Sequence, residues 1–391
     1  MQQGARAASG GVGRARGPGY DPAVAYSSFE PRRFAERLGA WLEARGPDAD
    51  VVVSCRTRLA RNVSGFPFVP KLEPALARDL CERLRPLLLE RRIDGETIWI
   101  AMPDASPLVR LLLRERHLVS RDLAPSDPTR EPEPGRAVAF GMDQTVSVMV
   151  NEEDHLRLQA ISSGFALQDA WERVRGLDRE LEHDVSFAVS KRLGYLTGCP
   201  TNVGTGLRAS VMLHLPALGL VRTEIDKVFA AAQRTGLAVR GMYGEGSRAA
   251  GDFYQISNQV TLGRTEDQLI ADLSALIPAI VDFERRVRDA LVAERRRYLE
   301  ERIERSRERL ATALSMPTEV TLAHLSDLRL GACIGLGADG LTPHALDAIA
   351  IQIQRGHVQV LSGDPVPADG LLEPSARDRL RASFLRRRFA K

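Results

Sequence analysis

The sequence is poor in lysine and carries almost no net charge, and both shortages limit its possible partners. Only four of its 54 Lys+Arg residues are lysine, and 51 Asp+Glu residues leave a formal net charge of +3. A chain whose acids balance its arginines lacks the basic surface that nucleic-acid binding requires, so no nucleic-acid partner is expected. We interpret the excess of arginine over lysine as a mark of GC-rich coding, without functional meaning by itself.

Cysteine is also scarce, and long apolar runs are absent. The cysteines are Cys55, Cys81, Cys199 and Cys333. They form no cluster with zinc-ligand spacing, so neither a disulfide framework nor a metal-ligand cluster is expected. No apolar stretch reaches the roughly 20 residues that a membrane-spanning helix needs. Residues 1–20 lack the apolar core of a secretory signal. We therefore expect a cytoplasmic protein without membrane contact, with a disordered tail over residues 1–28.

Hydrophobic periodicity predicts short helices and strands in mixed order. Helices are expected over residues 31–44, 74–90, 165–192 and 223–235, and in two pieces over 265–314. A smaller helical region runs from residue 321 to the end and is interrupted over 363–370. Strands are expected over 51–54, 97–101, 137–141, 146–151, 238–243 and 253–262, while 208–215 fits either a helix or a strand. Hairpin-linked strands with helices outside them favour an α+β fold.

Four short strings gather the residue types that phosphate chemistry uses. They cover residues 54–62, 151–157, 197–210 and 240–246, and each mixes arginine with a turn-forming glycine or proline, an acid or a thiol. Arginine is a fixed cation whose planar fork fits phosphate oxygens. Carboxylates beside such a clamp must serve something else, most simply a second cation. The pattern therefore indicates an anionic phosphate donor that meets a cationic acceptor.

Together and in this order, the strings resemble those of the phosphagen (guanidino) kinase family, and within it the bacterial protein arginine kinases. The resemblance runs from about residue 51 to about residue 291, with a further match near the C-terminus. It implies an antiparallel sheet flanked by helices, similar to the glutamine synthetase catalytic fold, over residues 29–291. A helical C-terminal domain over residues 292–391 would follow. The implied activity is transfer of the ATP γ-phosphate to arginine guanidino groups of proteins, with ATP and Mg²⁺ as cofactors.

The resemblance also implies the residues that bind ATP. The phosphate clamp would consist of Arg56, Arg58, Arg157, Arg208 and Arg240. The rest of the ATP site would be Ser54, Cys55, Thr57, His117, Ala209, Ser210, Val211, Met212, Gly241, Met242, Tyr243 and Gly244. One such arginine taken alone is most often a solvated surface charge, so the assignment depends on the matching positions together.

Glu153, Glu245 and Cys199 are the expected catalytic residues. A protonated guanidinium is a poor nucleophile, and a carboxylate beside it can orient one nitrogen and accept its proton. By resemblance, Glu153 and Glu245 grip the acceptor from two sides, and Cys199 is the family's reactive cysteine. Glu152 and Asp154 would reach magnesium only through water. The alternatives are a strand-end acid for Glu153, a turn residue for Glu245 and a small buried thiol for Cys199.

The C-terminal run 377–382 matches the RDxxRA motif with which protein arginine kinases bind phosphoarginine. The implied ligands are Arg377, Asp378, Arg381 and Ala382. Ser375 followed by Asp378 predicts a helix N-cap with an acid at the third helical position. A helix start with arginines one turn apart can hold a phosphate. Taken alone, the run also fits an ordinary capped basic helix.

Partners and alternatives follow from the same resemblance. It implies protein substrates with exposed arginines, a homodimer, a zinc-binding activator protein, and a Clp-type unfoldase and protease in a stress response. A kinase of small guanidino substrates and a catalytically silent phosphoarginine-binding adaptor stay open. Small-substrate kinases carry a helical domain before the first arginine string, whereas only 49 residues precede Asp50 here. Intact Glu153, Glu245 and Cys199 argue against the silent adaptor.

Overall fold

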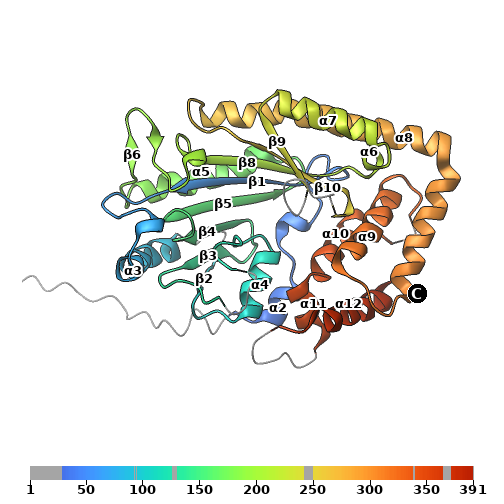
Figure 1. Ribbon diagram of the computed structural model, residues 1–391, viewed down its shortest axis with the longest axis horizontal. Coiled ribbons are helices and arrows are strands. Elements are labelled where there is room, and N and C mark those ends of the chain that lie inside the picture. Colours follow the sequence, from blue (N-terminus) through green and yellow to red (C-terminus); the bar gives the residue numbers. More distant parts are fainter. Residues whose placement is uncertain are drawn as a thin grey trace, which may run out of the picture.

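An eight-stranded antiparallel sheet forms the centre of the computed structural model (Figure 1). The structure describes residues 29–390 apart from residues 92, 94, 126–129, 242–249, 338–339 and 364–370. The strand order is β2-β3-β4-β5-β1-β8-β10-β9, and each neighbouring pair is antiparallel. The strands are β1 Val52–Arg61, β2 Thr97–Ala101, β3 Ala137–Gly141, β4 Val146–Val150, β5 Leu156–Ser163, β8 Leu207–His214, β9 Leu237–Gly241 and β10 Phe253–Asn258. The predicted α+β class is confirmed.

One face of the sheet is covered by helices and holds the main core. The helices are α3 Pro74–Glu90, α5 Leu167–Glu182, α6 Pro216–Leu220, α7 Arg222–Arg234 and the first part of α8 Glu266–Thr312. Trp171 of α5 and Leu273 of α8 belong to one buried cluster with Leu59 and Val211 of the strands. Because successive side chains alternate between the two faces of a strand, burial of this set directs the other set to the opposite face.

The opposite face is covered only in part. The covering elements near β2 to β4 are α2 Pro31–Glu36 and α4 Pro107–Glu115, and the 3₁₀ turn η1 Ala40–Leu42 packs on β5. Beside them lie the C-terminal helices α9 Thr318–Cys333, α10 Pro343–Gln352, α11 Arg355–Ser362 and α12 Pro374–Phe389. These helices form their own apolar core with the end of α8. Ile351 of α10 meets Ile161 of β5 in a small cluster with Trp41, so the C-terminal helices stand over one end of the sheet.

The predicted elements agree best with the structure where the pattern is local. The helix over 74–90, the strand over 97–101 and the hairpin of β3 and β4 are confirmed, and 208–215 is a strand. The expected helix over 31–44 is wrong in extent, because Arg37 adopts an extended conformation that ends α2. The helix over 165–192 stops at Glu182, and a separate small hairpin of β6 Val189–Ser190 and β7 Gly194–Tyr195 follows. Helix α4 and strand β5 (Leu156–Ser163) were not predicted from the sequence.

Helix α8 runs through 47 residues and joins the two parts of the molecule. Its backbone leaves the helical conformation at Arg295, where φ is −137° and ψ is 32°. Residues before this point pack on the sheet, and residues after it pack on α9 and α12. The expected two helical pieces are therefore confirmed, with the break between them at Arg295.

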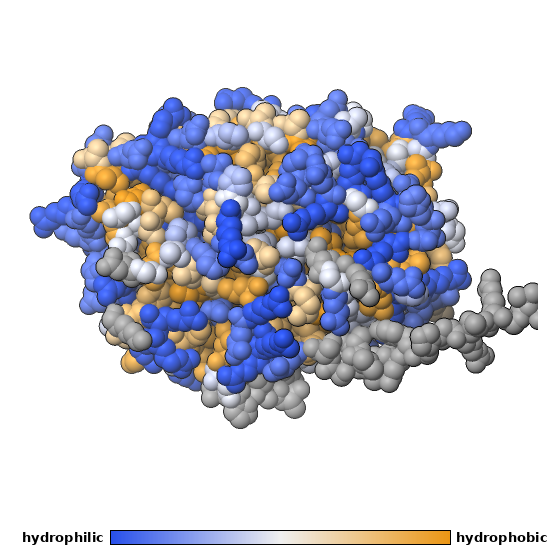
Figure 2. Space-filling model, turned by 180° about the vertical axis from the view of Figure 1, so that it is seen from behind, coloured by the Kyte–Doolittle hydropathy of each residue, from blue (hydrophilic) through white to orange (hydrophobic). Residues whose placement is uncertain are grey.

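The face of the molecule behind the view of Figure 1 is mostly hydrophilic. Figure 2 shows hydrophilic side chains over much of the face behind the view of Figure 1, with smaller hydrophobic patches between them. Among the residues that the structure describes, none of the helices combines the length and the apolar character needed to cross a membrane.

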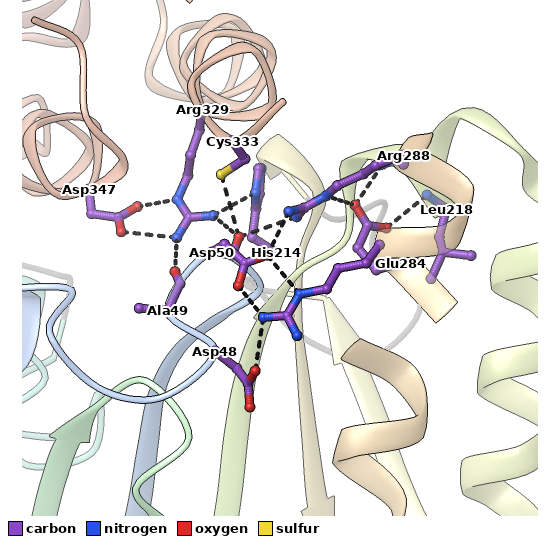
Figure 3. A network of polar contacts seen from close by, with 12 residues as sticks. Asp48, Ala49, Asp50, His214, Leu218, Glu284, Arg288, Arg329, Cys333 and Asp347 are labelled. Carbon is purple, nitrogen blue, oxygen red and sulfur yellow. Dashed lines mark hydrogen bonds and ion pairs between the residues drawn. The ribbon is translucent and has the colours of Figure 1, made fainter. Parts of the chain in front are cut away.

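A buried polar network joins the sheet to the C-terminal helices (Figure 3). Arg329 of α9 donates to both carboxylate oxygens of Asp347 on α10, at 2.8 and 3.2 Å. The same guanidinium donates to the backbone oxygens of Ala49 and Asp50, which precede β1, at 2.9 and 2.8 Å. His214 at the end of β8 lies 2.9 Å from Arg329 through Nδ1. Burial and the neighbouring arginines hold the pKa of His214 well below its ordinary value, so the ring stays neutral beside the guanidinium.

Asp50 ties α8 into the same network. Its carboxylate accepts hydrogen bonds from Arg285 at 2.5 and 3.1 Å and from Arg288 at 3.1 Å. Burial alone would raise the pKa of Asp50, but the hydrogen bond from Arg285 and the charges of both arginines outweigh it and lower the pKa. The segment that leads into β1 is thus held by charged groups from α8 and α9 together.

Replacing Arg329 with leucine is expected to lower the free energy of unfolding by about 3–5 kcal/mol, because it leaves the Asp347 carboxylate buried without its partner. Arg297 is the control, since its pair with Glu301 is exposed and Arg297→Leu should change the free energy by less than about 1 kcal/mol. Urea unfolding of both variants measures the difference. A loss at Arg329 no larger than that at Arg297 would contradict a stabilising role for the network.

Candidate active site

The register of β1 and β8 brings arginines from two of the predicted strings together. Arg58 lies directly opposite Arg208, and Arg56 lies directly opposite Ser210. Directly opposed residues of an antiparallel pair point to the same face of the sheet. All four side chains therefore share the face that the helical core leaves partly open.

The neighbouring strands add the remaining two arginines to this face. Arg157 of β5 is paired with Ala60 of β1. Ala60 points to the same face of the sheet as Arg56 and Arg58, because alternate residues of a strand share a face. Arg240 of β9 is paired with Gln255 of β10, and Gln255 is in turn paired with Met212 of β8. The clamp predicted from four separate strings is thus one row of guanidinium groups across β5, β1, β8 and β9.

Burial and the concentration of positive charge lower the pKa values of two of these arginines. Burial, together with the charges of Arg157 and Arg208, lowers the pKa of Arg56 to about 10. Burial and the three neighbouring arginines lower the pKa of Arg58 well below its ordinary value. Within the described part of the chain, the buried Nε of Arg58 makes no hydrogen bond. Buried donors are normally paired, so this group fits an anionic oxygen at the clamp.

A cavity of about 560 Å³ adjoins the clamp on the side of the C-terminal helices. Ser54, Arg56 and Met212 form its sheet wall, and Trp41 and Ile351 stand opposite. A volume of this size lies within the range of small-molecule sites, and mixed apolar and polar walls suit a base and a ribose. Cavity and arginine row together therefore fit a nucleotide triphosphate.

His117 lies in this cavity, as expected. It follows α4 in a left-handed conformation with φ of 59°, and its carbonyl accepts a hydrogen bond from Gln159 Nε2 at 2.6 Å. The ring stands edge-on to Trp41, with 5.6 Å between the ring centroids. Burial and the charge of Arg56 lower the pKa of His117 to about 4. The imidazole is therefore neutral near pH 7 and offers the nucleotide a flat, uncharged surface.

Glu153 stands at the edge of the clamp. Arg157 donates to Glu152 Oε1 and to Glu153 Oε2, each at 2.7 Å. Glu152 is buried and also accepts a hydrogen bond from Ser120, whereas 39% of the Glu153 side chain is exposed. Of these two acids, Glu153 is the one that an incoming cation can reach.

The Cys199 loop lies against the Glu153 segment. Asp154 Oδ1 accepts hydrogen bonds from Gly198 N and from Asn62 Nδ2, both at 2.6 Å. A Cβ atom on Gly198 would lie only 2.7 Å from the carbonyl oxygen of Glu153, so only glycine permits this approach. Cys199 is partly exposed next to this contact, and its Sγ lies 3.0 Å from Thr201 Oγ1. Glu153 and Cys199 are thus brought to the same side of the clamp.

Asp154 differs from its expected role. It is fully buried, and burial raises its pKa despite the hydrogen bonds from Gly198 and Asn62. A water-mediated contact with magnesium does not fit this position, nor does it fit the buried Glu152. In the described part of the chain, no group of three or more His, Cys, Asp or Glu side chains could hold a metal ion. Magnesium at this site would thus have to rely on phosphate oxygens and water.

Several expected ATP-site residues point away from the clamp. Cys55, Thr57, Ala209 and Val211 occupy the alternate positions of β1 and β8, on the face covered by helices. Thr57 donates to the carbonyl of Ala170 on α5 at 2.7 Å, and burial raises the pKa of Cys55 to about 12. Their side chains therefore serve the core.

The fourth string is described only at its start. Arg240 and Gly241 belong to β9. Gly241 is paired with Tyr254 and lies next to Arg240 along the strand, so it faces the opposite side of the sheet. Met242, Tyr243, Gly244 and Glu245 lie outside the described residues.

The sequence analysis missed the supporting roles of Arg61 and Asn62 at the end of the first string. Arg61 forms a two-point pair with Asp178, donates to the carbonyl of Thr205 at 2.9 Å, and lies 3.5 Å from the ring centroid of Tyr195. Asn62 donates to the carbonyl of Leu196 at 3.0 Å as well as to Asp154. Both side chains fix the ends of the Cys199 loop. Their position directly after the clamp arginines was the feature of the sequence that could have indicated these roles.

The C-terminal motif is partly buried. The predicted N-cap at Ser375 is wrong, because α12 begins at Pro374 with Glu373 as its N-cap and no side-chain cap. Proline fits the first helical position, and the helix starts two residues earlier than predicted. Arg381 is buried and donates to the carbonyls of Ile353 and Met316, each at 2.7 Å, and to Asp378 at 2.6 Å.

Arg377 and Asp378 are the motif residues nearest the surface. Arg377 borders a small hollow together with Arg110, Arg114 and Arg355. Burial and the charge of Arg355 lower the pKa of Arg377. Ala382 is buried in the C-terminal core. Contact with a ligand from solution therefore falls to the first half of the motif.

Family comparisons cover most of the chain. The family described as ATP:guanido phosphotransferase, C-terminal catalytic domain, matches residues 88–287, and the family described as protein-arginine kinase McsB C-terminal domain matches residues 296–391. The protein-arginine kinase of Bacillus subtilis (strain 168) is 39% identical over 355 residues, which are 90% of this chain and 94% of that protein. That of Moorella thermoacetica is 40% identical over 356 residues, covering 90% and 97%.

Solved structures share the fold. The duplicated taurocyamine kinase from Schistosoma mansoni with bound transition state analog components is 26% identical, with a TM-score of 0.55 over 67% of this chain. This chain spans only 38% of that duplicated protein. Lombricine kinase is 26% identical with a TM-score of 0.53, over 64% of this chain and 70% of that one. From its sequence relatives, its sheet and its arginine row, this chain belongs to the ATP:guanido phosphotransferase family, among the protein-arginine kinases.

Proposed function

We propose that this chain transfers the γ-phosphate of ATP to the guanidino group of arginine in protein substrates. The observation that supports this most directly is the position of Arg157, which belongs to the clamp and also binds Glu153 at 2.7 Å. A phosphate donor and a cationic acceptor would meet at this point. Phosphoryl transfer depends on such positioning and on neutralisation of the donor charge rather than on covalent help.

The donor side would work through charge and shape. Bound ATP with Mg²⁺ supplies the phosphoryl group and part of the charge compensation. Arg56 and Arg58, which repel one another in the ligand-free chain, would bind the phosphate oxygens, and the neutral His117 and Trp41 would border the base. The arginine fork can fit two oxygens at once, so the row fixes the orientation of the phosphates.

The acceptor side would work through Glu153 and Cys199, with Glu245 as the proposed second carboxylate. A guanidinium between these groups would be oriented with one nitrogen toward the phosphate row. Glu153 would accept the proton as the nitrogen–phosphorus bond forms and the bond from the γ-phosphorus to the β–γ bridging oxygen breaks, which releases ADP. Hydrogen bonds from Asn62 and Gly198 to Asp154 support the loop on which Cys199 lies, so they keep the two acceptor groups at a fixed separation.

We also propose two domains, with a boundary near residues 291–296. The break of α8 at Arg295 and the meeting of the two family matches between residues 287 and 296 support this boundary. A phosphoarginine site in the C-terminal part would use Arg377 and Asp378 for contact, with Arg381 and Ala382 as internal supports. A homodimer, a zinc-binding activator, a Clp-type unfoldase and protease, a cytoplasmic location and a stress-response role rest on the family resemblance alone.

Labelled ATP distinguishes the proposed activity from its alternatives. With Mg²⁺ and an unfolded arginine-containing protein, we expect acid-labile label on the protein and none on free arginine. Glu153→Gln should reduce this label by several orders of magnitude because it removes the proton acceptor, whereas Glu131→Gln, an exposed acid elsewhere, should not. Label on free arginine alone would indicate a small-substrate kinase. Phosphoarginine binding without any transfer would indicate the adaptor.

Arg58→Lys tests the fork geometry of the clamp. Lysine keeps one charge but cannot bind two oxygens in one plane, so kcat should fall by about 10²–10³-fold, the effect of losing one preorganised donor. The melting temperature should not fall, since a crowded cation is replaced by one that loses its proton more readily. Arg173→Lys on the exposed surface of α5 is the control. Full activity of the Arg58→Lys variant would show that Arg58 is not part of the phosphate clamp.

Titration calorimetry with free phosphoarginine tests the C-terminal site, with the active site occupied by a nucleotide analogue. Arg377→Ala should weaken binding by at least about tenfold, as expected for loss of a charged hydrogen bond to phosphate. Arg379→Ala changes an exposed arginine of the same run and should bind as the wild type does. Equal affinity in all three proteins, or none in the wild type, would leave only a basic helix.

A further inference from the structure

We propose that a groove beside Glu153 binds the polypeptide segment that carries the acceptor arginine. The groove has a volume of about 380 Å³. One wall is the 3₁₀ turn η2 (Val69–Lys71) with the start of α3, the other is residues 133–136, and Asn151 to Glu153 form the floor. The inference rests on the proposed function, since it names how a protein substrate would reach the acceptor carboxylate.

The first wall is apolar. Val69, Pro70, Leu72 and Pro74 line it. Phe68 precedes this wall in the chain and is 37% exposed. Apolar side chains that remain in contact with solvent beside a cleft are a common mark of a binding surface. A side chain next to the substrate arginine would be removed from water against this wall.

The opposite wall and the floor are acidic. Three carboxylates, those of Glu133, Glu152 and Glu153, line the groove, against a single lining arginine, Arg136. Glu152 is buried against Arg157, so Glu133 and Glu153 are the two that a substrate can reach. Arg136 pairs with Glu133 at 2.7 Å, but 62% of the Glu133 side chain is exposed, so this pair is weak. The Glu133 carboxylate can therefore exchange Arg136 for a basic group on a substrate. The groove suits a segment that is positively charged and carries an apolar neighbour.

The groove leads to the clamp through Glu153. One oxygen of Glu153 binds Arg157 of the arginine row, while the side chain also borders the groove. The nucleotide cavity and the groove share no lining residue, and Ser120 of the cavity bonds to Glu152 of the groove between them. A guanidinium that enters along the groove thus meets the phosphate row from the side opposite the nucleotide cavity.

The walls are held in place before any substrate binds. Asn151, at the end of β4, donates through Nδ2 to the carbonyls of Ala77 on α3 and Gly135 on the other wall, at 3.1 and 2.9 Å. Gly135 has φ of 78°, and a Cβ atom there would lie 2.5 Å from the backbone of Ala77. A preformed groove loses little conformational entropy on binding, so the ordering cost falls on the substrate segment alone.

Two peptides that differ only beside their single arginine test the groove. One carries leucine on each side of the arginine and the other carries glycine, and both carry one distant lysine. We expect the wild type to favour the leucine peptide by about tenfold in kcat/KM, mainly through KM, which corresponds to about 1.4 kcal/mol. Val69→Asp should abolish the preference. Leu314→Asp, which changes a side chain 78% exposed in the C-terminal part, should keep it.

The charge contribution is tested by Glu133→Lys against Glu131→Lys, which makes the same change two residues away and outside the groove. Only Glu133→Lys should raise KM for both peptides. Fluorescence anisotropy of the labelled leucine peptide gives a readout without turnover. Transfer with no dependence on Val69 or Glu133 would overturn the groove while leaving the proposed function intact. Binding that depends on both residues, without transfer, would support the groove and overturn the proposed function.

Discussion

The crowding of guanidinium groups on one face of the sheet is the constraint on which the rest of the structure depends. Burial, and after it the charges of the neighbouring arginines, lower the pKa values of Arg56 and Arg58. Isolated side chains would move apart, but β1 is hydrogen-bonded on both sides, to β5 and to β8. A slip of one residue in either register would turn the arginines into the apolar core. The buried apolar side chains around Leu59, on the opposite face of β1, therefore fix the register that keeps the arginines on their own face of the sheet.

The acceptor side is built in a different way. Its groups come from loops, and loops have no register to fix them. The chain compensates with side chains that reach across, such as Asn62 and Asp154, and with glycines where two backbones approach closely. The separation between Glu153 and Cys199 is thus set by neutral and buried partners that need not take part in the reaction. Fixed separation of this kind is what gives intramolecular reactions their advantage.

The sequence predicted the chemistry more completely than the geometry. The alternation within 54–62 already assigns Arg56 and Arg58 to one face and Thr57 to the other, yet a contiguous motif suggests a contiguous site. Pairings such as Arg329 with Asp347, or Asp154 with Gly198, join residues that no local pattern connects. The start of α12 was readable, because Pro374 suits the first helical position better than the interior. Strand β5 also has an apolar residue on each side of Arg157, but the acids just before it belong to a turn and mask the start of the strand.

Helix α8 has a consequence for how the two parts of the chain depend on each other. Its 47 residues are interrupted by the break at Arg295, and the change from one family match to the other falls inside it. Leu291 and Leu299, on either side of Arg295, belong to the same buried cluster as Leu330 of α9. A boundary in the sequence is therefore not a boundary in the packing. Either half, separated from the other, would expose the apolar side chains of this cluster and leave groups of the ionic network without partners, so each half stabilises the other.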